Sequence, residues 1–341
     1  MAPPRCDMKK EQRRERVGWQ AKNTDEAART EKPEKKIRFE KEPAAESADK
    51  SGENPTDEKP ALKKRTVRKR LLAAAVTLAA LIVLLSLGMQ TAVFLSAAVT
   101  SYWHPDYEKE DIASLLDKEE LTEEDYDLLY RQTGLTAIGV ERCLARGEEG
   151  KQRILEIQED YFRAHPTRQS YFSPFFATAY IDEPVTHCYL QEGDVLVTSS
   201  TQFSGMAMGH AGLVTDASSG GVLQTSAYGA GSAIDSVEDF TGRVTFLLLS
   251  PKADKETKLA VSDYAEKELV GLPYSIAAGI LTDKESGQET QCAHIVWYAY
   301  RQFGIDLDSD GGRVVTPRDL ANSDEMEVVQ VFGFDPETLW R

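Results

Sequence analysis

The sequence predicts an α+β domain that is joined to a membrane by one helix near the N-terminus. Residues 71–105 contain no formally charged side chain, and about 20 consecutive apolar residues suffice to cross the hydrocarbon core of a bilayer. Further along the chain, short β-rich runs cluster together between segments with helical periodicity, an order typical of α+β domains. The 341-residue chain has only four cysteines, too few for a disulfide-dense scaffold.

The charged residues are distributed unevenly about the apolar segment. Residues 1–70 hold 21 Lys and Arg against 14 Asp and Glu, a net charge of +7, so the net charge of −16 leaves −23 for the rest of the chain. Because basic flanks stay in the cytoplasm, we expect the N-terminus inside the cell and the acidic part outside. That acidic part is unsuited to general nucleic-acid binding, which needs clustered Lys and Arg.

The apolar segment predicts an uncleaved signal anchor over residues 71–95, which makes the chain a single-pass protein of the plasma membrane. A cleaved signal peptide is the alternative, because residues 96–98 are small, but 70 residues before the apolar run far exceed an ordinary leader. The basic residues 63–70 could also bind anionic lipid head groups. Residues 1–70 are poor in apolar side chains and predict a disordered cytoplasmic tail.

Residues 96–166 predict a helical stalk, which is either a spacer between the anchor and the globular domain or a cap on that domain. Thr122 precedes three acidic residues, a typical helix start, and Gly134 is a typical helix end. Further helical patterns cover residues 137–146 and 151–164.

Residues 167–341 predict the globular domain. Strands are expected at residues 195–198, 211–215, 222–225 and 244–249, and helices at residues 258–270 and 293–303.

Cys292 is the candidate nucleophile of this domain. A thiol hydrolase needs a cysteine at a helix N-terminus, which favours the thiolate, and a histidine that reaches it from another element. His294 lies two positions further along the same helix, about 200° around its axis, and points elsewhere. His210, at the edge of a predicted strand, is the better partner, and Gln224 on the next strand could orient its imidazole.

Seven short segments of the domain form a recognisable series. They are GDVLV at 193–197, GHAGLV at 209–214, VLQ at 222–224, GLPY at 271–274, QCAHIV at 291–296, GIDL at 304–307 and TPRDL at 316–320. Together they resemble segments of the NlpC-type cysteine hydrolases. The histidine precedes the cysteine here, an order similar to the circularly permuted, YiiX/YebB-like branch of these papain-like enzymes. The resemblance covers about residues 190–325, roughly 40% of the chain.

The resemblance implies a permuted papain-like fold and a role for each candidate residue. Cys292 would be the nucleophile, His210 the general base and then the general acid, and Gln224 the residue that orients the imidazole. Tyr274 would line the substrate cleft. The alternatives are an inert buried thiol for Cys292, a structural histidine for His210, an ordinary strand residue for Gln224 and a core residue for Tyr274.

The implied reaction is hydrolysis of an amide bond through an acyl-enzyme. Peptidoglycan stem peptides are the leading substrate, because an anchored exterior domain suits a cell whose wall adjoins its membrane. Lipid acyl groups are the alternative, which would make the protein a thioesterase, acyltransferase or lipid amidase. A catalytically silent wall-binding scaffold is a further alternative, since an amide orients an imidazole less strongly than a carboxylate does.

Neither a metal nor another cofactor is expected. Asp306, Asp308 and Asp310 have the spacing of the start of a calcium loop, but Pro317 occupies the twelfth position, where such loops carry a glutamate. Cys143 and Cys188 could form a disulfide outside the cell, which would leave Cys292 as a free thiol.

Overall fold

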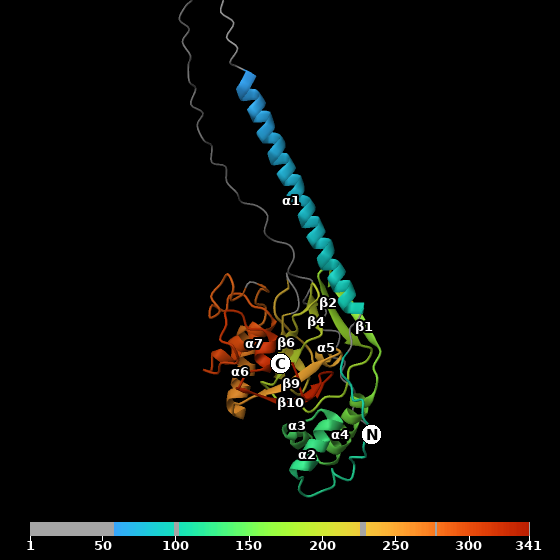
Figure 1. Cartoon of the computed structure of the whole chain (residues 1–341). Coiled ribbons are helices and arrows are strands. Elements are labelled where there is room, and N and C mark those ends of the chain that lie inside the picture. The colour runs from blue at the N-terminus through green and yellow to red at the C-terminus, as the bar shows by residue number, and fades with distance from the viewer. Residues whose placement is uncertain (1–57, 99–101, 226–229, 277, 341) are drawn as a thin grey trace, which may run out of the picture. The chain divides into compact units, whose positions relative to one another are not determined.

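The computed structural model describes residues 58–98, 102–225, 230–276 and 278–340 (Figure 1). Of the disordered tail predicted for residues 1–70, residues 1–57 lie outside the described range, and for residues 58–70 the prediction is wrong, because they are helical. The helices and strands from Val67 onward belong to one unit.

One helix in the described part is long and apolar enough to cross a membrane, as the sequence predicts. Helix α1 runs Glu58–Ala98. The apolar 18-residue window within its span Arg65–Leu95 is not buried in the rest of the protein, whereas Val93 near the end of the span is buried. The helix begins before the apolar run at Leu71, because residues 58–70 are rich in good helix formers. Pro60 lies in the first turn, where proline is tolerated.

Three short helices occupy the region of the predicted stalk. The N-terminus of the first is closed by a capping box, in which Thr122 and Asp125 each accept a hydrogen bond from the other's backbone N–H. Gly134 ends that helix with a φ of 72°, and a β-carbon there would lie 2.1 Å from the carbonyl oxygen of Val331. Only glycine fits this position. The helices are α2 (Glu123–Thr133), α3 (Ala137–Leu144) and α4 (Glu148–Phe162).

The remainder confirms the α+β prediction, with two antiparallel sheets. The larger sheet has the order β10-β9-β3-β6-β7-β8, and the smaller has the order β1-β2-β4-β5. The elements that the sequence predicts are β3 (Val195–Thr198), β6 (His210–Asp216), β7 (Gly221–Gln224), β9 (Phe246–Pro251), α6 (Lys255–Glu268) and α7 (Cys292–Arg301). The elements that it does not predict are β1 (Thr167–Ser173), β2 (Phe176–Ile181), β4 (Thr201–Phe203), β5 (Met206–Ala207), β8 (Ala233–Ser236), β10 (Met326–Phe332), α5 (Glu238–Thr241) and α8 (Pro317–Ala321).

The central strands of the larger sheet are buried on both faces, whereas its edge strand β8 is exposed. Alternate residues of a strand point to opposite faces, so Val195 and Val197 pack in one hydrophobic cluster with α6 and α7. Leu196 packs in a second cluster with residues of α2, α3 and α4. Figure 1 shows these two groups of helices as separate sets. The helices of the predicted stalk therefore share a core with the sheet.

A buried ion pair also joins these helices to the sheet. The Arg142 guanidinium donates two hydrogen bonds, of 2.6 and 3.1 Å, to the carboxylate of Asp194, which is fully buried. Ser250 accepts a further bond from Arg142 and one from Lys258. Asp194 thus balances buried positive charge at the start of β3.

Candidate active site

His210 and Gln224 lie on neighbouring strands and form a hydrogen bond. His210 begins β6, and β7 pairs with β6 so that Gln224 lies opposite Gly212. The His210 Nε2 atom is 2.6 Å from Gln224 Oε1. Because an amide oxygen only accepts hydrogen bonds, Nε2 carries the proton and Nδ1 keeps a free lone pair. The ring is therefore held in the tautomer that can accept a proton through Nδ1.

The Gln224 amide is itself fixed by two carboxylates. Its Nε2 donates to Asp235 at 3.0 Å and to Asp239 at 3.1 Å, so its oxygen has to face the imidazole. Arg243 donates to the same Asp239 oxygen at 2.8 Å. Gln224, the residue that orients His210, is thus itself hydrogen-bonded to a carboxylate.

The sequence interpretation did not identify Asp235, Asp239 or Arg243. Asp239 and Arg243 lie one helical turn apart on the segment that contains α5, and this spacing is the only sequence signal for the pair. The position of Asp235 follows from β8, which was not predicted.

Burial and a neighbouring cation both keep His210 neutral. The pKa of His210 is lowered to about 3, first because the ring is buried and second because Arg243 is positively charged. The bond to Gln224 and the charge of Asp239 oppose this shift without reversing it. The ring also stacks on Phe240 at 5.4 Å between centroids. At neutral pH the imidazole therefore carries one proton and can act as a base by accepting a second.

Cys292 is the first residue of α7, the helix start that the sequence predicts. The preceding residue, Gln291, caps the helix, since its Oε1 accepts the Ala293 N–H at 2.9 Å. The Cys292 thiol is half-buried and lies 3.5 Å from the same oxygen. Burial raises its pKa, while the backbone N–H of Ala211 and the charge of Arg243 act in the opposite direction. The net shift favours the thiol, contrary to the thiolate expected at a helix start.

The Ala211 interaction brings the thiol to the end of β6 that carries the candidate base, because Ala211 follows His210 directly. Among the described residues, however, no hydrogen bond joins Cys292 to His210. Tyr274 lies close enough for a Cys292 thiolate to help raise the pKa of its phenol to about 12, although burial is the larger cause. The four candidate residues thus gather at one end of β6 and α7.

His294 is occupied elsewhere. Its Nδ1 lies 2.9 Å from the Thr290 hydroxyl, and its Nε2 lies 2.8 Å from the Lys284 carbonyl oxygen. Both ring nitrogens therefore have partners remote from the thiol.

Cys143 and Cys188 are buried neighbours. Their sulfur atoms are 3.7 Å apart, and both are free thiols in the structure. The two residues are adjacent, as a disulfide requires, but they are not bonded.

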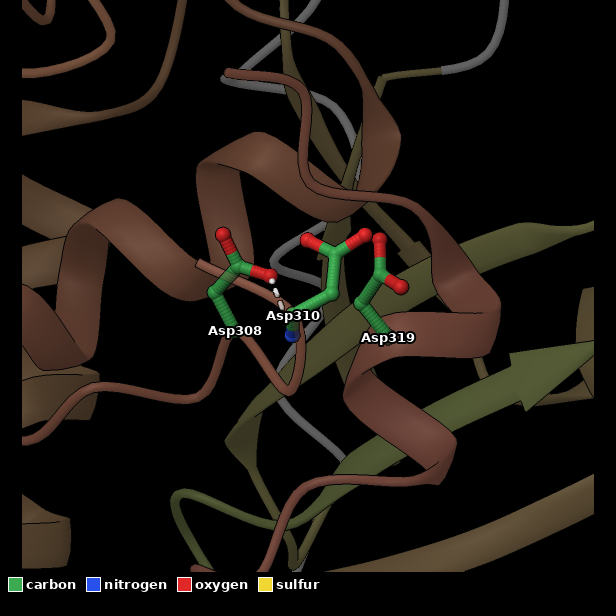
Figure 2. Close-up of side chains that lie close together, drawn as sticks. All are labelled: Asp308, Asp310 and Asp319. Atoms are coloured by element: carbon green, nitrogen blue, oxygen red, sulfur yellow. Dashed lines mark hydrogen bonds between the residues drawn. The ribbon is translucent and has the colours of Figure 1, made fainter. Parts of the chain in front are cut away.

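Three carboxylates, those of Asp308, Asp310 and Asp319, lie close together near the candidate calcium loop. Figure 2 shows the three side chains close together, and their ligand atoms lie within 4.8 Å of one another. Asp306 is not in this group, because it accepts a hydrogen bond from the Trp297 indole. An ion pair with Lys284 occupies Asp308, and the Thr316 hydroxyl donates to Asp319. The Gly312 N–H donates to Asp310 at 2.7 Å, so all three carboxylates already have donors.

Comparison with known protein families, characterised proteins and solved structures finds no match. The chemistry available to the candidate site therefore has to be argued from its geometry. A half-buried thiol at a helix start, near a neutral histidine whose free nitrogen can accept a proton, can perform nucleophilic attack on a carbonyl.

Proposed function

We propose that this chain is a membrane-anchored thiol hydrolase that works outside the cell, with Cys292 as nucleophile and His210 as base. The observation that carries the proposal is the hydrogen bond from His210 to Gln224. This bond leaves Nδ1 of His210 unprotonated. The Cys292 sulfur interacts with the Ala211 N–H and therefore lies at the same end of β6. The order of the motifs supports a permuted NlpC-type domain of papain-like fold.

The reaction begins with neutral reactants. The raised pKa of Cys292 and the lowered pKa of His210 favour a thiol and an imidazole over a preformed ion pair. His210 Nδ1 takes the thiol proton as the sulfur attacks the substrate carbonyl carbon. The backbone N–H of Cys292 has no partner within the helix and can stabilise the oxyanion.

The same histidine completes the reaction. The imidazolium donates its proton to the leaving group as the tetrahedral intermediate collapses, which leaves an acyl group on Cys292. His210 then removes a proton from water, and the resulting attack releases the carboxylic acid and restores the thiol. Gln224 and the carboxylates behind it keep the ring oriented throughout.

An amide bond of cell-wall stem peptides is the substrate that we propose first, because one helix would hold the domain close to the wall. Lipid acyl groups are the second candidate. The observation that favours them is the exposure of Met206 and Met208, apolar side chains shortly before His210.

The test is a comparison of wild type with Cys292→Ala and His210→Ala. Full-length protein in detergent would be incubated with soluble muropeptides and, separately, with dispersed phospholipids, and the products followed by mass spectrometry. Turnover of either substrate that both variants lose supports the hydrolase. Turnover that Cys292→Ala retains, or binding to wall fragments without turnover, contradicts it and favours a scaffold.

A further inference from the structure

Large apolar side chains gather on the smaller sheet without being buried. Tyr171 and Phe172 are each 51% exposed, Met206 is 57% exposed and Met208 is 43% exposed. Phe176 adds to this apolar group, because its ring stacks on that of Phe172 with 5.2 Å between the ring centroids. The two hairpin ends are neighbours, since Phe176 pairs with Phe203 and their ring centroids are 4.7 Å apart. Several exposed apolar side chains on neighbouring hairpin ends mark an interaction site more often than a single exposed residue does. We call residues 171–176 and 203–208 the aromatic tips.

One of the aromatic tips lies against helix α1. Ser204 and Gly205 form the tight turn between β4 and β5, with φ values of 51° and 81°. A β-carbon placed on Gly205 would lie 3.4 Å from the β-carbon of Ala92. The turn therefore touches the apolar segment that is suited to cross a membrane.

The position of Ala92 along α1 gives the depth of this contact. At a rise of 1.5 Å per residue, about 20 residues of helix match a hydrocarbon core about 30 Å thick. Counted from Leu71, where the apolar run begins, the core ends near residue 90. Ala92 and the turn beside it then lie at the level of the lipid head groups on the far side of the membrane from the basic residues 63–70.

We propose that the aromatic tips dock on the lipid surface from which α1 emerges. Tyrosine and other aromatic side chains favour this interface, where an apolar ring and polar head groups meet. A lipid surface is the partner that the contact with α1 selects, since the tips lie beside the membrane whenever α1 spans it. The same docking holds the start of β6 near the membrane, because His210 follows Met208 by two residues.

The docking does not depend on the chemistry of Cys292. A Cys292→Ala variant should dock like the wild type even if it has lost all hydrolytic activity. Failure of the proposed function and failure of this inference can therefore be told apart.

The experiment uses the full-length protein in vesicles that contain phospholipids with a photoreactive group high in the acyl chain. After irradiation, lipid adducts are mapped by mass spectrometry. We expect adducts on peptides that contain residues 171–176 and 203–208, in addition to α1. The internal control is the peptide with Ile280 and Leu281, which are 52% and 84% exposed but lie outside the tips and should remain unlabelled.

A pair of variants provides a second comparison. Combined Phe172→Asp and Met206→Asp should lower lipid labelling of both tips at least fivefold, while Leu281→Asp should leave it unchanged. Adducts confined to α1 in the wild type, or equal labelling of the tips and of residues 280–281, would overturn the inference. The wild-type result decides the matter even if the double variant does not fold.

Discussion

The orientation of one imidazole is the central feature at the scale of single residues. An amide orients a histidine less strongly than a carboxylate does, which is why the sequence alone left a silent scaffold as an alternative. In the structure, Asp235 and Asp239 hold the Gln224 amide, so that its oxygen faces His210. Gln224, which orients the histidine less strongly than a carboxylate would, is thus itself held by two carboxylates.

Gln224→Ala should lower the rate at which iodoacetamide modifies Cys292 at pH 7 by about tenfold or more, because the ring loses the partner that fixes its tautomer. The matched control is Gln330→Ala. Gln330 is an equally buried amide, which accepts the Cys188 backbone N–H remote from the candidate site. Equal reactivity of Cys292 in the two variants would contradict an orienting role for Gln224.

The pKa of His210 gives a second prediction. Since its folded-state pKa is about 3 and its unfolded-state value is about 6.5, the unfolded chain binds an extra proton between these values. The contribution of His210 to stability is therefore fully present above pH 6.5 and is lost as the pH falls toward 3.

An NMR titration of the His210 ring should accordingly show no protonation between pH 8 and pH 5. Arg243→Gln removes a nearby positive charge and should raise the midpoint, provided that the fold is retained. A midpoint near 6.5 in the wild type would contradict the buried, neutral base.

At the scale of elements, the buried pair of Arg142 and Asp194 links α3 to the start of β3. Asp194→Asn leaves the buried Arg142 and Lys258 without their counter-charge, so we expect a loss of about 3–5 kcal/mol in the free energy of unfolding. The control is Asp263→Asn, which removes an exposed pair with Lys267 and should cost less than about 1 kcal/mol. Denaturant unfolding measures both, and equal effects would contradict the linking role.

Sequence patterns located the central elements well because those elements are regular and fully buried. β3 coincides with its predicted bounds, and α7 begins within one residue of the predicted start. The smaller sheet escaped prediction, since its strands β4 and β5 are short and β1 has no buried residue. The apolar residues of these strands alternate poorly, so no period of two stands out.

The candidate site was predictable in part for the same reason. Cys292 and His210 lie at the starts of regular elements, which the sequence reveals. Asp239 lies in a four-residue helix, too short to leave a periodic signal, and Arg243 lies two residues beyond the end of that helix. Their role depends on tertiary contacts with Gln224, which the sequence pattern does not contain.

At the scale of the whole molecule, the account requires a single membrane crossing with the N-terminus inside. A membrane-impermeant maleimide applied to intact cells should therefore reach a cysteine introduced at Leu281, an exposed position in the part of the chain that we propose lies outside the cell. It should not reach the native Cys6 until the cells are permeabilised. Labelling of Cys6 in intact cells would contradict the orientation.

The measurement that tests the central claim most directly is the alkylation of Cys292 in the full-length protein, with each cysteine followed separately by mass spectrometry. Wild type and His210→Ala would be compared across a range of pH. The account predicts that Cys292 reacts at pH 7 at least tenfold faster in the wild type, while the buried Cys143 and Cys188 react slowly in both. If Cys292 reacts at the same rate whatever residue occupies position 210, the two do not act as a nucleophile and its base.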